Sequence, residues 1–274
     1  MPELTMAWSE GWLWLSGSLF LTVFGANLAW FFRQPRSGMV VDEFVIPLIA
    51  WRFSPWLLEL LRLLYYIGVP FAALLWGHDA VVGRLLGLQH LNWPTLSDGV
   101  TGAAVTANWL DWAYDVGWTA ALGIGVWTLL ALGWWAYRRA LISTDAGGTV
   151  SGIDASGWVL LREAAYHEVH WAFYRNVLII AWSAYWGTWG GLALVGLEAA
   201  LNPAWRKGLT NPQQAPAQLM RGALAVISGA LSLLTQNLWL ALALHWGVSW
   251  GLVVLVRTLP LRICQPEQAA SREL

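Results

Sequence analysis

The sequence predicts an all-α protein, a polytopic bundle of about six or seven transmembrane helices that forms one membrane domain over residues 1–274. Of its 274 residues, 58% are hydrophobic and 11% are charged, whereas a soluble domain carries about 25% charged residues. Several apolar runs reach the roughly 20 residues that a helix needs to cross the hydrocarbon core. The chain also has 23 tryptophans, a residue that gathers where lipid tails meet headgroups.

Six apolar runs are the candidate spans, and in chain order they cover residues 12–32, 57–76, 116–137, 177–201, 219–234 and 238–256. An acidic N-terminal segment precedes the first run, so we expect a retained helix there rather than a secretory signal, which starts with positive charge. Pro70 predicts a kink in the second run. The fifth run is short for a span, and a C-terminal tail at about 258–274 follows the sixth.

The segment 157–201 contains no proline and would be about 67 Å long as one straight helix. The hydrocarbon core is only about 30 Å thick. The segment must therefore contain two elements. We expect a polar helix at about 158–175 and a span at 177–201.

Basic residues predict the orientation, because cytoplasmic loops carry an excess of lysine and arginine. The loops after the first and third runs hold Arg33, Arg36, Arg52, Arg138 and Arg139, whereas the loop between the second and third runs holds one basic residue, Arg84. We therefore expect a multi-pass protein of the inner (plasma) membrane whose N-terminus lies outside. The net charge of −1 argues against nucleic acid as a partner. The expected partners are the lipid bilayer and either other membrane subunits or a membrane peptide substrate.

The polar helix carries the candidate site. At 100° per residue, Glu163, His167 and His170 fall on one face, while Glu168 and Arg175 share a second face. Ionisable groups within a membrane are costly and are functional by default. We expect Glu168 and Arg175 to form an ion pair that a third group or a water bridges. The alternative is an interfacial amphipathic helix with its charges in water.

His245 lies in the middle of the last apolar run, with Ser249 one turn further on. It is either a packing residue or one half of a polar site, because an unpaired polar group in lipid is costly. Since both segments need polar partners in low dielectric, we expect the polar helix to pack against the His245 span.

Two segments resemble the CAAX-protease-like (CPBP or Abi) family of intramembrane peptidases. The run from Glu168 to Arg175, with its aromatic residues, is similar to the family's first motif, a glutamate pair followed by an aromatic residue and an arginine. His245 with Ser249 is similar to the last motif, a histidine with an asparagine four residues later. The resemblance covers roughly the last 120 residues. It implies peptide-bond hydrolysis by an activated water.

The resemblance also implies roles for the candidate residues. Glu163 or Glu168 would be the general base, and Arg175 would fix the second carboxylate. The histidines would polarise the carbonyl or hold a divalent metal; they are His167, His170 and His245.

The chain departs from the family pattern in three ways. The two glutamates are not adjacent, Ser249 replaces the asparagine, and no phenylalanine–histidine motif lies between Arg175 and His245. These departures favour a second interpretation, a non-catalytic structural or assembly subunit of a larger, energy-transducing membrane complex. A third interpretation is a subunit that binds haem or a pigment through the same histidines.

Overall fold

The computed structural model describes residues 2–33, 47, 50–76, 102–143 and 155–258. In these ranges the regular secondary structure is helical throughout, which confirms the all-α bundle. The elements are α1 (Pro2–Arg33), α3 (Ser54–Leu63), α4 (Val69–Trp76), α6 (Gly102–Ser143), α7 (Gly157–Ala181), α8 (Ala184–Leu201), α9 (Pro203–Thr210), α10 (Ala215–Thr235) and α11 (Leu238–Thr258). The expected C-terminal tail lies outside the described residues, apart from Thr258.

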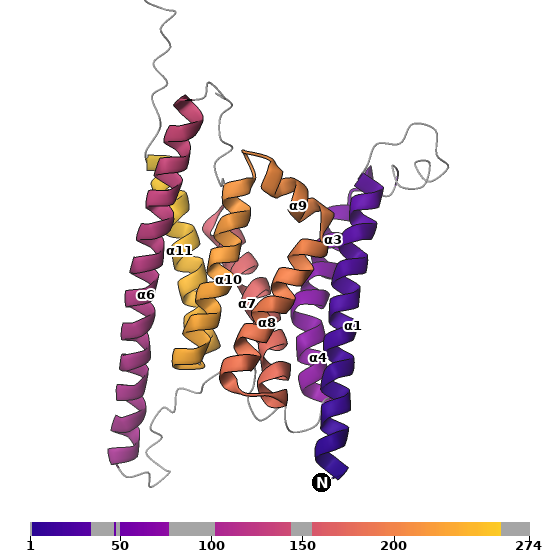
Figure 1. The fold of residues 1–274 in the computed structure, drawn as a ribbon, viewed down its shortest axis with the longest axis vertical. Coiled ribbons are helices and arrows are strands. Elements are labelled where there is room, and N and C mark those ends of the chain that lie inside the picture. Colours follow the sequence, from indigo (N-terminus) through magenta and orange to yellow (C-terminus); the bar gives the residue numbers. More distant parts are fainter. Residues whose placement is uncertain (1, 34–46, 48–49, 77–101, 144–154, 259–274) are drawn as a thin grey trace, which may run out of the picture.

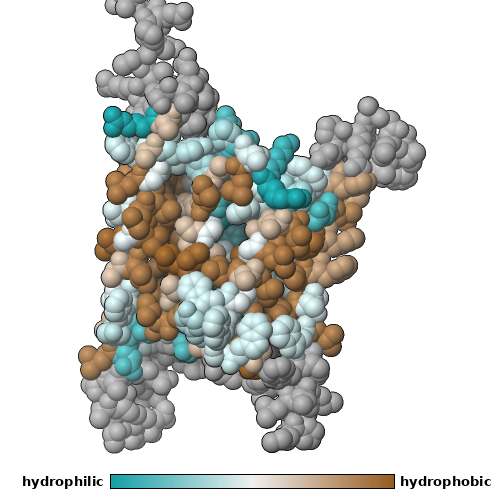
Figure 2. Space-filling model, in the orientation of Figure 1, coloured by the Kyte–Doolittle hydropathy of each residue, from teal (hydrophilic) through white to brown (hydrophobic). Residues whose placement is uncertain are grey.

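Five helical segments are long and apolar enough to cross a membrane, so the chain is an integral membrane protein. They cover Gly11–Phe32, Ser54–Ala73, Trp109–Ala140, Ala215–Thr235 and Leu238–Thr258. The fifth apolar run is therefore longer than the sequence indicated. Figure 2 shows a mainly hydrophobic middle of the molecule, with hydrophilic residues toward both ends.

The helices run along one common direction, with α6 at one side of the bundle and α1 at the other (Figure 1). Between them lie α7, α8, α10 and α11, while the short α9 joins α8 to α10 at one end. The N-terminus of α1 and the turn between α7 and α8 lie at the opposite end. The packed core therefore sits where α7 meets α8, α10 and α11.

The second span contains a wider turn where the sequence predicted a kink. A π-helical turn at Leu64–Gly68 joins α3 to α4, and Pro70 is the second residue of α4. Proline has no N–H to donate to the carbonyl one turn earlier, and its ring crowds that carbonyl. The widened turn accommodates both effects without breaking the helix.

The expected span at 177–201 is wrong, because the chain reverses in the middle of it. The polar helix continues as α7 to Ala181, and α8 begins at Ala184. Between them, Ser183 adopts an extended backbone, and its Oγ accepts a hydrogen bond from Trp186 N at 3.3 Å. This N-cap starts a new helix, which returns antiparallel to α7.

Glycine allows the two arms of this hairpin to approach closely. A Cβ on Gly187 would lie 2.3 Å from the backbone nitrogen of Ile179, and a Cβ on Gly191 would lie 2.8 Å from Arg175 Cγ. Small residues allow such close packing between membrane helices. At the tip of the hairpin, Trp182 and Trp186 are exposed, as interfacial anchors are.

Candidate functional site

Glu168 lies on α7 at the centre of the bundle, and its side chain is 1% exposed. Oε1 lies 2.9 Å from Nδ1 of His245 on α11. The Ser228 hydroxyl on α10 donates to Oε2. When Glu168 is ionised, its oxygens only accept hydrogen bonds, and Nδ1 of His245 is then the donor in this pair. The polar helix therefore packs against the His245 span, as the sequence predicted.

Arg175 completes this group of four residues, called here the Glu168 cluster: Glu168, Arg175, Ser228 and His245. Its Nη1 donates to Ser228 Oγ at 2.9 Å, and its Nη2 lies 3.9 Å from Glu168 Oε2. Ser228 therefore bridges the glutamate and the arginine, which confirms the expected ion pair and its bridging group. Each member is buried, so removing one would strand the others in low dielectric.

Aromatic rings cover the histidine of this cluster. The His245 ring stacks on His167 at a centroid distance of 5.7 Å and on Trp171 at 5.5 Å. His167 and Trp171 also stack on each other, at 5.3 Å. Nδ1 of His167 is buried and has no hydrogen-bond partner among the described residues. His167 therefore contributes its ring face to this stack.

His170 belongs to a second polar pair, away from the Glu168 cluster. Its Nε2 lies 3.1 Å from Oε2 of Glu198 on α8. Three tyrosines surround the imidazole, with ring centroids between 4.3 and 5.3 Å away: Tyr65, Tyr66 and Tyr174. This pair ties the two arms of the hairpin together and packs them against the π-helical turn.

Glu163 belongs to a third group, which joins α7 to α3. Its Oε2 accepts from Arg62 Nη2 at 2.7 Å, and its Oε1 lies 3.5 Å from Arg162 Nη2. Arg162 also pairs with Glu59 at 3.2 Å, and the Tyr166 hydroxyl donates to Glu59 at 2.9 Å. The four charged side chains are partly exposed, whereas Tyr166 is buried. These ion pairs form a network near the N-terminal end of α7, where the side chains are more accessible than in the middle of the helix.

The structure thus divides the predicted site among three places. Glu168, Arg175 and His245 come together, with His167 stacked beside them. His170 and Glu163 share a helix face with His167, as expected, but each binds a partner on a different helix. Within the part of the chain that the structure describes, no three His, Cys, Asp or Glu side chains are arranged to hold a metal ion.

Sequence reasoning missed two residues that complete these groups. Glu198 is the single acid in the apolar helix α8, and a charge in such a helix is a signal for a polar partner. Ser228 is one of two serines in α10, and nothing in its local sequence distinguishes it. Only the packing of α10 against α7 identifies it.

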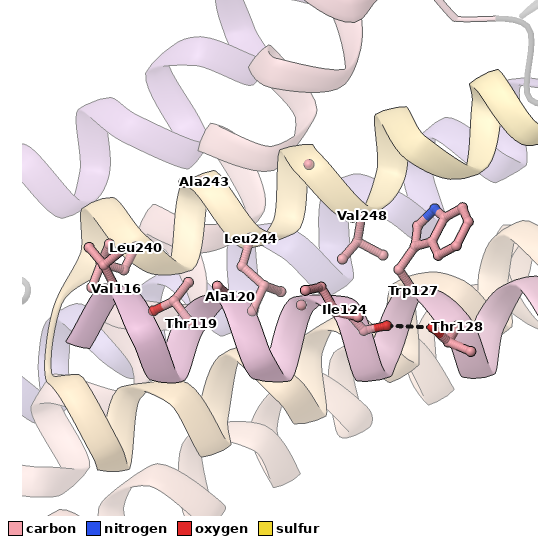
Figure 3. A pocket seen from close by; sticks show the side chains of 12 residues that line it. Val116, Thr119, Ala120, Ile124, Trp127, Thr128, Leu240, Ala243, Leu244 and Val248 are labelled. Atoms are coloured by element: carbon pink, nitrogen blue, oxygen red, sulfur yellow. Dashed lines mark hydrogen bonds between the residues drawn. The ribbon is translucent and has the colours of Figure 1, made fainter. Parts of the chain in front are cut away.

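A small cavity adjoins one member of the Glu168 cluster. The cavity next to Arg175 has a volume of about 10 Å³ and is also lined by Trp171, Thr188 and Gly191. That volume holds about one water. A larger cavity of about 580 Å³ lies between α6 and α11, lined mainly by apolar side chains (Figure 3). Comparison with protein-family models, curated proteins and solved structures finds no match to this chain.

Proposed function

We propose that this chain is a CAAX-protease-like membrane protein whose polar core stabilises the fold, and that it acts by binding, as a structural or assembly subunit, rather than by hydrolysis. One observation carries the proposal. Both oxygens of Glu168 have partners, on α10 and α11, and its side chain is 1% exposed. A general base must lie within hydrogen-bond reach of the water that it activates, and burial closes this carboxylate off from outside water.

The arrangement supports the family resemblance. Glu168 and His245 stand 77 residues apart, in the two separate segments that carry the resemblance, and they lie within hydrogen-bonding distance. The resemblance implies a histidine from the segment between them. The residue that this segment brings to the carboxylate is Ser228. A serine hydroxyl cannot take up a proton near neutral pH as an imidazole does.

The space around the cluster supports the non-catalytic role. A hydrolytic site must hold a peptide carbonyl about 3 Å from both the water and an electrophilic donor. The adjoining cavity of about 10 Å³ has room for one water but none for a peptide. On this account the Glu168 cluster holds α7, α10 and α11 together.

The test compares cleavage of membrane peptides by the wild type with cleavage by two variants. The protein is reconstituted in liposomes with prenylated and unprenylated membrane peptides. The two variants are Glu168→Gln and Glu163→Gln, which make the same change at two positions of α7. We expect the same background with all three proteins. Cleavage by the wild type that Glu168→Gln abolishes while the variant stays folded would establish the peptidase instead.

We also propose that the end of the bundle that carries Arg138 and Arg139 faces the cytoplasm, as the excess of basic residues there predicts. The C-terminal end of α11, which carries Arg257, lies at the same end of the bundle as the C-terminal end of α6. The N-terminus then faces outside. Labelling of single cysteines at Gln213 and Ser183 from either side of sealed vesicles tests this, and labelling of position 213 only from outside would reverse the orientation.

A further inference from the structure

Besides the cavity between α6 and α11, a groove lies along α6, and none of its lining residues belongs to the Glu168 cluster. It has a volume of about 370 Å³, within the range of ligand pockets. Side chains from α6, α10 and α11 line it: Leu129, Leu130, Gly133, Trp134, Tyr137, Pro216, Leu219, Met220, Ala223, Leu252 and Val256. All are apolar or aromatic, and the helices that carry them flank an open, hydrophobic surface (Figure 2). The groove therefore fits a hydrocarbon chain.

Positive charge gathers at one end of this groove. Arg138 lies with its Cζ 5.9 Å from the ring centroid of Trp134, which lines the groove. Arg139 follows in sequence and lies over Trp135 at 5.1 Å. On α11, Arg257 directly follows the lining residue Val256 and is exposed. The stretches of α6, α10 and α11 that line the groove, residues 129–143, 215–223 and 244–258, contain four arginines and no acidic residue.

The larger cavity between α6 and α11 provides a contrast. It begins at Val116 and Thr119 (Figure 3), and the charged residues nearest to it in sequence on α6 are Asp111 and Asp115. An anion would be repelled at that end. The two hollows along the same helix therefore differ in the charge beside them.

We propose that the groove between α6, α10 and α11 binds an anionic phospholipid, with an acyl chain along the groove and the phosphate beside Arg138, Arg139 and Arg257. Lipid tails gain no hydrophobic energy by leaving other tails, so the arginines provide the selectivity. A guanidinium binds phosphate oxygens through paired N–H donors. Anionic lipids are concentrated in the cytoplasmic leaflet, where the proposed orientation places these arginines.

Two kinds of variant test the two halves of the site. Gly133→Leu fills the groove, because a Cβ at Gly133 meets nothing within 4 Å and the added side chain can extend into the hollow. Gly125→Leu is the matched control on the same helix, with equally open surroundings but outside the groove. The double variant Arg138→Gln/Arg139→Gln removes two positive charges from the end of the groove. Arg52→Gln is its control, because it removes an arginine that lies next to α3 and away from the groove.

The measurement is native mass spectrometry of detergent-purified protein with phosphatidylglycerol or phosphatidylcholine carrying the same acyl chains. We expect the wild type to prefer phosphatidylglycerol. Loss of two surface charges should weaken that binding about 10- to 30-fold. Gly133→Leu should reduce binding of both lipids, and the two controls should behave as the wild type.

Three results would overturn the proposal. Equal binding of the two lipids by the wild type would remove the role of the arginines. Unchanged phosphatidylglycerol binding by Gly133→Leu would place the lipid elsewhere. A wild-type dimer that Gly133→Leu dissociates without loss of lipid would make the groove a contact between copies of the chain. The arginine variant leaves the groove lining unchanged, so it tests the proposal even where Gly133→Leu does not fold.

Discussion

Replacing Glu168 by glutamine should cost this protein about 3–5 kcal/mol of stability. The glutamine retains one oxygen, which can accept from Ser228, while its amide can face His245 after that ring changes tautomer. The hydrogen bonds are therefore largely replaceable. What is lost is the negative charge 3.9 Å from Arg175. At an effective dielectric of about 20, a pair at that distance interacts by about 4 kcal/mol.

Glu163→Gln is the matched control, because it is the same change on the same helix. The Glu163 and Arg62 side chains are 23% and 40% exposed, so water compensates most of the loss. We expect a cost of at most about 1 kcal/mol. Denaturation in detergent micelles, followed by tryptophan fluorescence, measures both variants under the same conditions.

The double variant Glu168→Gln/Arg175→Met separates the loss of charge balance from the loss of packing. Methionine removes the stranded cation, so the double variant should recover about 2 kcal/mol or more of what the single variant lost. The reasoning fails if Glu168→Gln and Glu163→Gln cost the same. It also fails if removing Arg175 as well makes the protein less stable than Glu168→Gln alone.

Three further predictions follow from the packing and the cluster. Gly187→Ala should destabilise the α7–α8 hairpin by about 1–3 kcal/mol, because the new Cβ would overlap the backbone of Ile179. Gly196→Ala on the same helix meets open space and should be neutral or stabilising. Thermal melts compare the two variants. Ser228→Ala should lower the free energy of unfolding by about 1–3 kcal/mol, because it leaves buried polar groups unsatisfied. The denaturation used for Glu168→Gln measures this cost. A cost no larger than that of Ser249→Ala would argue against a bridge by Ser228 between Glu168 and Arg175. The purified protein should show no visible absorption band, since the His245 ring is buried and stacked against His167 and Trp171. A band that His245→Gln removes would favour the haem or pigment interpretation.

Much of this fold follows from hydropathy alone. Apolar runs of sufficient length place the spans, and Pro70 marks the place where the second span widens. The reversal at Ser183 was missed, because the segment around it is apolar and has no proline. Its signals are the glycines at 187, 190 and 191, which become meaningful only when a second helix packs on them.

The candidate site was predictable where charge must be neutralised. Burial in a bilayer requires a partner for Glu168, and the sequence offered Arg175 and His245. Helix periodicity predicted His167 and His170 on one face, whereas the structure places His167 against His245 on α11 and His170 against Glu198 on α8. It could not assign their partners, because those depend on how α7 packs against α3, α8 and α10. Ser228 was hidden for the same reason.

The most direct test of the account is whether water reaches the Glu168 cluster, because that result does not depend on knowing a substrate. A single cysteine is placed at Ser228 in a Cys264→Ser background and exposed to a charged thiol reagent, with Gln213→Cys as an exposed control. The account predicts that position 213 reacts rapidly and that position 228 is protected in the folded protein. Comparable labelling of both positions would show an open, hydrated site and would contradict a purely structural core.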